Sequence, residues 1–155
     1  MTYARVEQWE WLSVTNARTR LTGLQLAAAF YGVTVVLHTA DHLRRGVSAV
    51  TPEVLLAGAL STIAAIVAIA LAFMAKRSAA VVAAGVGLFN AVGVAAVHLL
   101  PRWGALSDSF TSGNAEAVSW AAVLLEIAGA LAFGVAGLYE LRESRPAATK
   151  NAGTI

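Results

Sequence analysis

The chain contains no cysteine, and charged side chains make up only 13% of its 155 residues. The missing cysteines exclude disulfides, iron–sulfur clusters, thiolate zinc sites and cysteine nucleophiles. A soluble domain carries about 25% charged residues, whereas here 58% of the residues are hydrophobic and the mean hydropathy is +0.69. The composition therefore predicts a membrane protein and excludes a water-soluble single domain.

Four apolar stretches are long enough to cross a bilayer, which takes about 20 residues at a rise of about 1.5 Å each. They cover residues 21–43, 52–74, 78–100 and 115–141. The second begins with a capping threonine and a first-turn proline, Thr51 and Pro52, and Pro101 closes the third. The expected fold is all-α: an integral membrane, antiparallel bundle of four transmembrane helices.

Basic residues are distributed unevenly between the two sides that four spans create. Eight of the eleven fall on the side of the two termini: Arg5, Arg18, Arg20, Lys76, Arg77, Arg142, Arg145 and Lys150. The other side has Arg44, Arg45 and Arg102. By the positive-inside rule we expect a plasma-membrane protein with both termini in the cytoplasm and loops 44–51 and 101–114 outside. The expected partner is the lipid bilayer, and no nucleic acid is expected.

The two ends of the chain flank an expected transmembrane domain at residues 21–142. Residues 1–20 are too polar for a signal peptide, and apolar residues recur every three positions from Tyr3 to Leu12. We expect a cytoplasmic amphipathic segment that lies at the membrane interface. Residues 143–155 are expected to form a disordered cytoplasmic tail.

Small residues recur at four-residue spacing along three spans, a pattern that lets helices in lipid approach closely. In the third span they are Ala83, Gly87, Ala91 and Ala95. The second span has Ala57, Ser61, Ala64 or Ala65, Ala68 and Ala72, and the fourth has Ala122, Gly129, Ala130, Gly134 and Gly137. These ridges predict tight packing between neighbouring helices.

Ionisable residues inside the spans are the best candidates for function, because an ionisable group in hydrocarbon is costly and usually faces the interior. His38, Asp41 and His42 lie at i, i+3 and i+4 and therefore share one helical face. His98 belongs to the small-residue ridge of the third span. Glu126 shares a face with the ridge of the fourth. We expect all five to face neighbouring helices.

Counting along the helices places the polar residues in two layers. His38 is six residues inside Arg44, or about 9 Å, and Glu126 is ten residues inside Glu116, or about 15 Å. The outer layer contains His38, Asp41, His42 and His98. The inner layer contains Tyr31, Thr34, Asn90 and Glu126.

The outer layer favours a transition-metal site. The expected ligands are His38, Asp41, His42 and His98, and three imidazole nitrogens with one carboxylate suit Zn²⁺, Cu²⁺ or iron. The H-x-x-D-H spacing is compact but is not diagnostic of any one metal. Glu126 and Asn90 would lie behind the ligands and orient them or relay protons.

Two other chemistries would use the same residues. A b-type haem could take His42 of the first span and His98 as axial ligands, with small residues making room for the ring. A proton-coupled transporter or intramembrane acid–base enzyme could use Glu126, Asn90 and Tyr31 as its catalytic groups.

A non-catalytic role is the competing interpretation, so the sequence leaves open whether the protein is an enzyme. Asp41 can pair with Arg44 or Arg45 at the end of the helix. Glu126 can be a neutral carboxylic acid bonded to Asn90. The protein would then be a scaffold, a homo-oligomer or a subunit of a larger membrane complex.

Overall fold

The computed structural model describes residues 22–113 and 115–144, and the regular secondary structure of these residues is helical, with no strand. The helices are α2 (Gly23–Arg45), the short 3-10 helix η1 (Val47–Ala49), α3 (Pro52–Phe73), α4 (Ala79–Leu99) and α5 (Ala117–Glu143). The four long ones are each long and apolar enough to cross a membrane, as predicted, which indicates a multi-pass membrane protein in contact with lipid. The segment 1–20 and residues 145–155 of the expected tail 143–155 lie outside the described residues, and Glu143 is the last residue of α5.

Local sequence signals place the helix ends within two residues of the predicted spans. Thr51 caps α3 and Pro52 occupies its first turn, as predicted. α4 ends at Leu99, because Pro101 keeps Leu100 in an extended conformation. The boundaries therefore follow from capping chemistry as well as from hydropathy.

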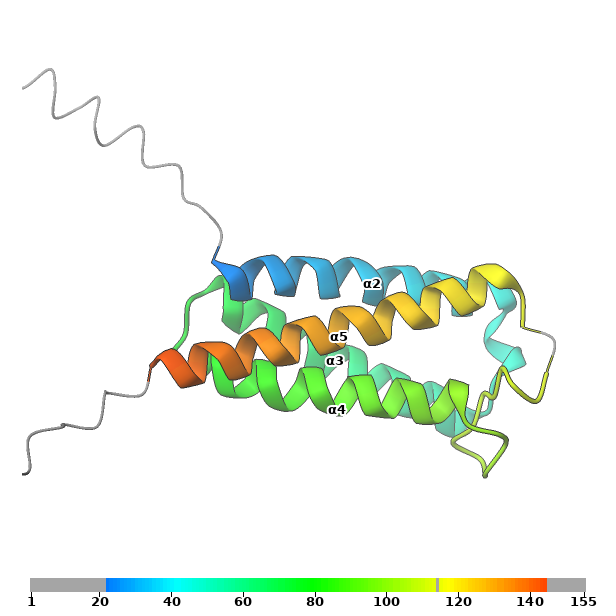
Figure 1. Ribbon diagram of the computed structural model, residues 1–155. Coiled ribbons are helices and arrows are strands. Elements are labelled where there is room, and N and C mark those ends of the chain that lie inside the picture. Colours follow the sequence, from blue (N-terminus) through cyan, green and yellow to red (C-terminus); the bar gives the residue numbers. More distant parts are fainter. Residues whose placement is uncertain (1–21, 114, 145–155) are drawn as a thin grey trace, which may run out of the picture.

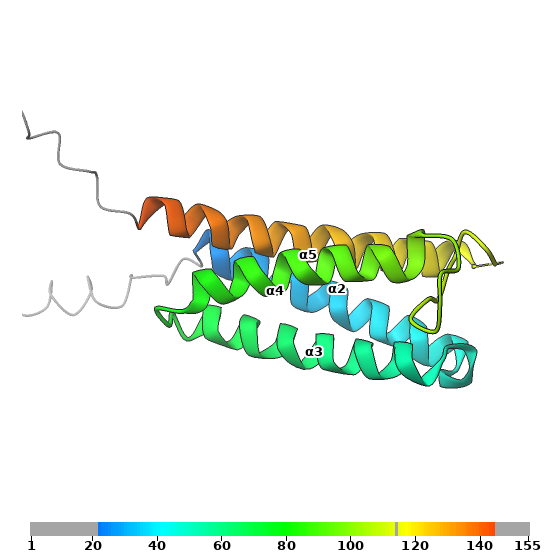
Figure 2. The same ribbon diagram turned by 90° about the horizontal axis from the view of Figure 1, so that it is seen from below.

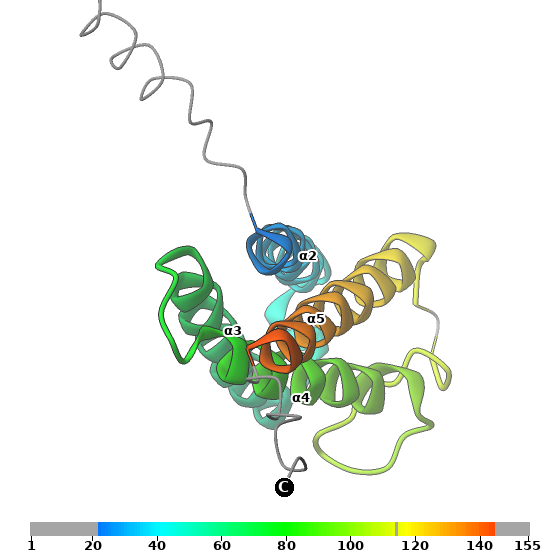
Figure 3. The same cartoon turned by 60° about the vertical axis from the view of Figure 1, so that its left-hand side comes forward.

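The chain runs back and forth between the two ends of an elongated bundle (Figure 1). The connections α2–α3 and α4–α5 lie at one end, which we call the loop end (residues 46–51, 100–113 and 115–116). The α3–α4 turn lies at the opposite end, beside the start of α2 and the end of α5 (Figure 1). α4 lies beside both α3 and α5 (Figure 2), and α2 closes the ring of four between α3 and α5 (Figure 3).

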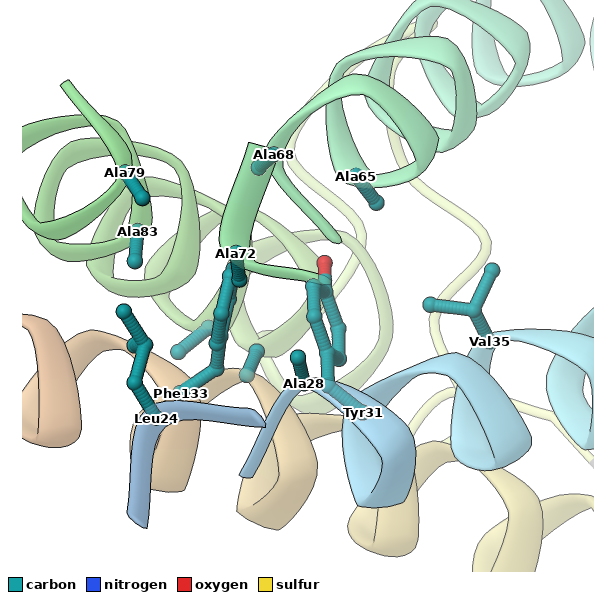
Figure 4. Packing of buried hydrophobic residues seen from close by; sticks show 12 residues of the cluster. Leu24, Ala28, Tyr31, Val35, Ala65, Ala68, Ala72, Ala79, Ala83 and Phe133 are labelled. Carbon is teal, nitrogen blue, oxygen red and sulfur yellow. The ribbon is translucent and has the colours of Figure 1, made fainter. Parts of the chain in front are cut away.

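Two aromatic rings fill the centre of the bundle, opposite small residues of α3 (Figure 4). Tyr31 of α2 and Phe133 of α5 are fully buried and stack with 5.7 Å between their ring centroids. Ala65, Ala68 and Ala72 of α3 are buried on the side that faces them. The predicted ridge of the second span thus makes room for the rings rather than for a helix backbone.

α4 and α5 pack backbone against backbone along what we call the glycine seam (Gly87, Gly134 and Gly137). A Cβ atom on Gly87 would lie 2.5 Å from the Gly134 nitrogen, and one on Gly137 would lie 2.6 Å from the Ala80 carbonyl oxygen. Real Cβ atoms do not approach so closely, so only glycine fits at these positions. The seam confirms the close packing that the small-residue ridges of the third and fourth spans predicted.

The outward faces of the long helices carry large apolar side chains. Examples that are more than half exposed are Leu56, Ile63, Phe89 and Val135. A continuous apolar surface of this kind would promote aggregation in water but is suited to lipid chains.

Replacing Gly87 by alanine should destabilise the bundle by about 1–3 kcal/mol, because the added methyl group overpacks the glycine seam. Gly85→Ala is a matched control two residues away on the same helix, since a Cβ there meets nothing within 4 Å. The midpoint of thermal unfolding in mild detergent, followed by circular dichroism, measures both. Equal midpoints for the two variants would contradict this packing.

Candidate metal centre

Three histidines from two helices meet near the loop end of the bundle. His38 and His42 come from α2, one turn apart, and His98 comes from the last turn of α4. The ring centroids lie 4.7 Å apart for His38 and His42, 5.0 Å for His38 and His98, and 5.7 Å for His42 and His98. One potential ligand atom of each lies within 4.8 Å of the others. The structure thus brings together the three histidines of the predicted ligand set.

His38 is bonded to Glu126 of α5 through its Nδ1 atom and the carboxylate Oε2. This contact corrects the two-layer picture, in which about 6 Å of depth separated the two residues. Side chains on a helix lean towards its N-terminus. The N-termini of α2 and α5 lie at opposite ends of the bundle (Figure 1), so the two side chains lean towards each other and close the gap.

The second ring nitrogen of His38 has the features of a metal ligand. Nε2 is buried and has no hydrogen-bond partner among the described residues. An ionised carboxylate can only accept, so a hydrogen bond to ionised Glu126 places the ring hydrogen of His38 on Nδ1. Nε2 then presents a lone pair to the cluster. A metal-ligating histidine usually donates its other N–H to a carboxylate or a carbonyl in this way.

His98 is held in the same manner by a backbone group. Its Nδ1 donates to the carbonyl oxygen of Asp108 at 3.1 Å, and a carbonyl can only accept. The lone pair of His98 therefore lies on Nε2. Only 2% of the residue is exposed, and its ring packs on Phe110 with 4.8 Å between centroids.

The segment after α4 folds back over the histidines. The N–H of Asp108 donates to the Val97 oxygen at 3.1 Å, and that of Phe110 donates to the His98 oxygen at 2.9 Å. Phe110 is buried beneath the loop. The contact of Phe110 with His98 was missed in the sequence, because an isolated aromatic residue in a polar loop carries no periodic signal.

Asp41 is buried on the histidine face of α2 but points to arginines. Its carboxylate oxygens lie 2.9 Å from Arg44 Nη2 and 3.2 Å from Arg45 Nε. This is the ion pairing that the sequence offered as the alternative to metal binding. The group of possible ligands formed by the three histidines does not include Asp41.

Arg45, at the end of α2 beside the loop end, contacts several residues around the histidines. Its Nη2 donates to Asp108 Oδ2 at 2.8 Å and to His42 Nδ1 at 3.0 Å. Its guanidinium carbon also lies 5.1 Å from the centre of the Phe110 ring. The contact with His42 was missed, although the i, i+3 spacing of the two residues permits it.

The three residues proposed for acid–base catalysis are divided between two polar pairs. Asn90 Nδ2 donates to the Tyr31 hydroxyl at 2.6 Å and to the Ser61 oxygen at 3.4 Å. Glu126 is bonded to His38 instead, and within the described residues no hydrogen bond joins it to Tyr31 or Asn90. The Thr34 hydroxyl donates to the Tyr31 carbonyl oxygen at 2.9 Å, so it is bonded to the backbone of its own helix.

Two shallow clefts open at the loop end, with volumes of about 210 and 220 Å³. Asp108 lines both, and Arg44 and Arg45 line the first. The guanidinium groups form ion pairs with three carboxylates, those of Asp41, Asp108 and Glu116. Arg102 lines the second cleft, so these three acids are matched by three bases and the charges of these residues balance.

Comparison of the chain with protein-family models, curated proteins and solved structures finds no match. The chemistry of the site therefore has to be argued from its own geometry.

Proposed function

We propose that this membrane protein binds one transition-metal ion at His38, His42 and His98. The observation that carries the proposal is the buried, unpartnered Nε2 of His38, whose other nitrogen is bonded to Glu126. Imidazole nitrogens suit Zn²⁺, Cu²⁺ and Fe²⁺, whereas Mg²⁺ and Ca²⁺ prefer oxygen. Three protein ligands leave a fourth position open for water or a substrate.

The ion would draw the three rings together. In a tetrahedral site with zinc–nitrogen bonds of about 2.0–2.1 Å, the ligand nitrogens lie roughly 3.3 Å apart. The present separations of up to 4.8 Å are wider, so binding requires a contraction of up to about 1.5 Å. A single ion also suits this space better than a haem, because His38 lies against both His42 and His98, where the porphyrin would have to pass.

The proposed topology is an antiparallel bundle in the plasma membrane with both termini in the cytoplasm. At the end opposite the loop end lie Lys76 and Arg77, between α3 and α4, and Arg142 in the last turn of α5. Together with the two terminal segments, that side of the spans has eight of the eleven Lys and Arg residues, against three on the side of the loop end, so by the positive-inside rule it is the cytoplasmic side. The metal centre then faces the outside of the cell.

A proton-coupled role is a second candidate, favoured by the bond between Glu126 and His38. A cation on the Nε2 atom of His38 would make the Nδ1–H of that ring more acidic, and the Glu126 carboxylate is placed to accept this proton. Glu126 then exchanges protons with the metal centre, which is a step towards ion-coupled transport. A scaffold without metal is the outcome to which a negative result below would point.

Purified protein without a histidine tag should bind about one Zn²⁺ per chain, and His38→Ala or His98→Ala should abolish this binding. Each of these two residues supplies one of the ligands on which the site depends. Isothermal titration with Zn²⁺, together with elemental analysis, provides the stoichiometry. An absorption spectrum of the same sample shows a Soret band if haem is bound instead.

Glu53→Gln is the control for this experiment, because Glu53 is an exposed acid at the start of α3 and outside the cluster. It should bind Zn²⁺ as the parent protein does. Unaltered Zn²⁺ stoichiometry in both histidine variants would overturn the metal site, and absence of binding in the parent would favour the scaffold.

Replacing Glu126 by glutamine should weaken Zn²⁺ binding by about tenfold or more without unfolding the protein. Loss of the group behind a ligating histidine typically weakens metal binding 10–100-fold. The glutamine carbonyl can still accept from His38 Nδ1, so the tautomer is kept while the charge is lost. The affinity is measured by the same titration, and an unchanged affinity would mean that Glu126 does not support the metal.

The absence of cysteine permits a direct test of topology with single cysteine variants. Ala105→Cys, exposed at the loop end, should react with a membrane-impermeant maleimide on intact cells. Ser78→Cys, exposed at the opposite end, should react only after the cells are permeabilised. The reverse pattern would place the metal centre on the cytoplasmic side.

A further inference from the structure

We propose that Arg45 is a latch that holds His42 out of the metal site until an incoming ion displaces the guanidinium group. The inference rests on the proposed function and explains how that site opens and closes. It follows from which ring nitrogen of each histidine is already engaged.

The three histidines are not equivalent as ligands. His38 and His98 each donate from Nδ1 to an oxygen, which leaves a lone pair on Nε2. His42 Nδ1 instead faces Arg45 Nη2 at 3.0 Å. Because a guanidinium group can only donate, His42 Nδ1 must accept, and the ring hydrogen of the neutral imidazole lies on Nε2. With Nδ1 engaged and Nε2 protonated, His42 offers no lone pair to an ion.

Arg45 is hydrogen-bonded to His42 through only one of its nitrogen atoms. Nη2 carries two hydrogens and uses one for Asp108 and one for His42. The Nε atom lies 3.2 Å from Asp41 Oδ2, but both atoms are buried without a hydrogen bond of acceptable geometry. The guanidinium group is therefore anchored through Nη2 and by the Phe110 face, and it can release His42 while it remains paired with Asp108.

In the metal-free protein, His38 and His98 can therefore bind an ion, whereas His42 cannot bind one while Arg45 contacts it. An ion that enters past Asp108 meets the lone pairs of His38 and His98 first. Release of Arg45 into the adjoining cleft of about 210 Å³ then frees His42 to complete the site. The separation of the ligand atoms, up to 4.8 Å, agrees with a site that is open before the third ligand joins.

The tautomers can be read directly by nuclear magnetic resonance of metal-free protein labelled with ¹⁵N-histidine, in detergent micelles. We expect two rings protonated at Nδ1 and one, His42, protonated at Nε2. Single histidine substitutions assign the three signals. This measurement requires neither a metal ion nor a variant of Arg45.

The effect on binding is tested with Arg45→Met, which keeps much of the apolar stem but has no donor. We expect its Zn²⁺ affinity to exceed that of the parent by about tenfold, the equivalent of one hydrogen bond to a charged group. Arg44→Met removes the same charge one residue away, where the bonds go to Asp41, Glu116 and Ser119. Its affinity should stay within about threefold of the parent, well below the effect of that bond.

The outcomes separate the latch from the metal site itself. A His42 ring protonated at Nδ1 in the metal-free protein overturns the latch, whether or not zinc binds. Equal gains for Arg45→Met and Arg44→Met also overturn it, because charge alone would then account for the effect. Absence of zinc binding in the parent and in both arginine variants overturns the proposed function, and the latch with it.

Discussion

Polar side chains inside a bilayer have no water to bond, so each needs a partner on its own helix or on a neighbouring one. In this bundle that constraint is met first by the bond between His38 of α2 and Glu126 of α5. Asn90 of α4 adds bonds to Tyr31 of α2 and to the backbone of Ser61 in α3. Ridges of small residues allow two helices to pack closely at more than one position along each other's axes. The hydrogen bonds between polar side chains can form at only one of these positions. The polar pairs therefore fix the register in which the four helices pack.

The histidine cluster depends on the same register. The glycine seam holds α4 against α5, and Glu126 ties α5 to α2. His98 at the end of α4 is thereby brought beside His38 and His42, although the two helices are not neighbours in sequence. A shift of one turn along the seam would move His98 about 5.4 Å away from the other two rings. Packing in the middle of the bundle thus determines the geometry at the loop end.

Much of this fold was predictable, and the part that was not has a common cause. The spans follow from length and hydropathy, and the 3.6-residue period correctly placed His38, Asp41, His98 and Glu126 on buried faces. Partner choice was not predictable, because it depends on which helices are neighbours and on the direction in which their side chains lean. That is why Glu126 was expected near Asn90 but is bonded to His38. Likewise, no spacing pattern in the sequence predicts that Phe110 packs against His98.

The distribution of charge with depth supports the proposed binding of a cation at the histidine cluster. At the rim, Asp41 is neutralised by arginines, where a helix end is close to water. Deeper in, Glu126 is paired with only a histidine among the described residues, and an ionised carboxylate there would lack a full counter-charge, which is costly. A divalent ion on the far side of His38 would supply that charge through the ring, since a bound metal is usually the largest charge in its surroundings. The three neutral imidazoles would add no negative charge. The Glu126 carboxylate would therefore be the group that offsets part of the positive charge of the ion.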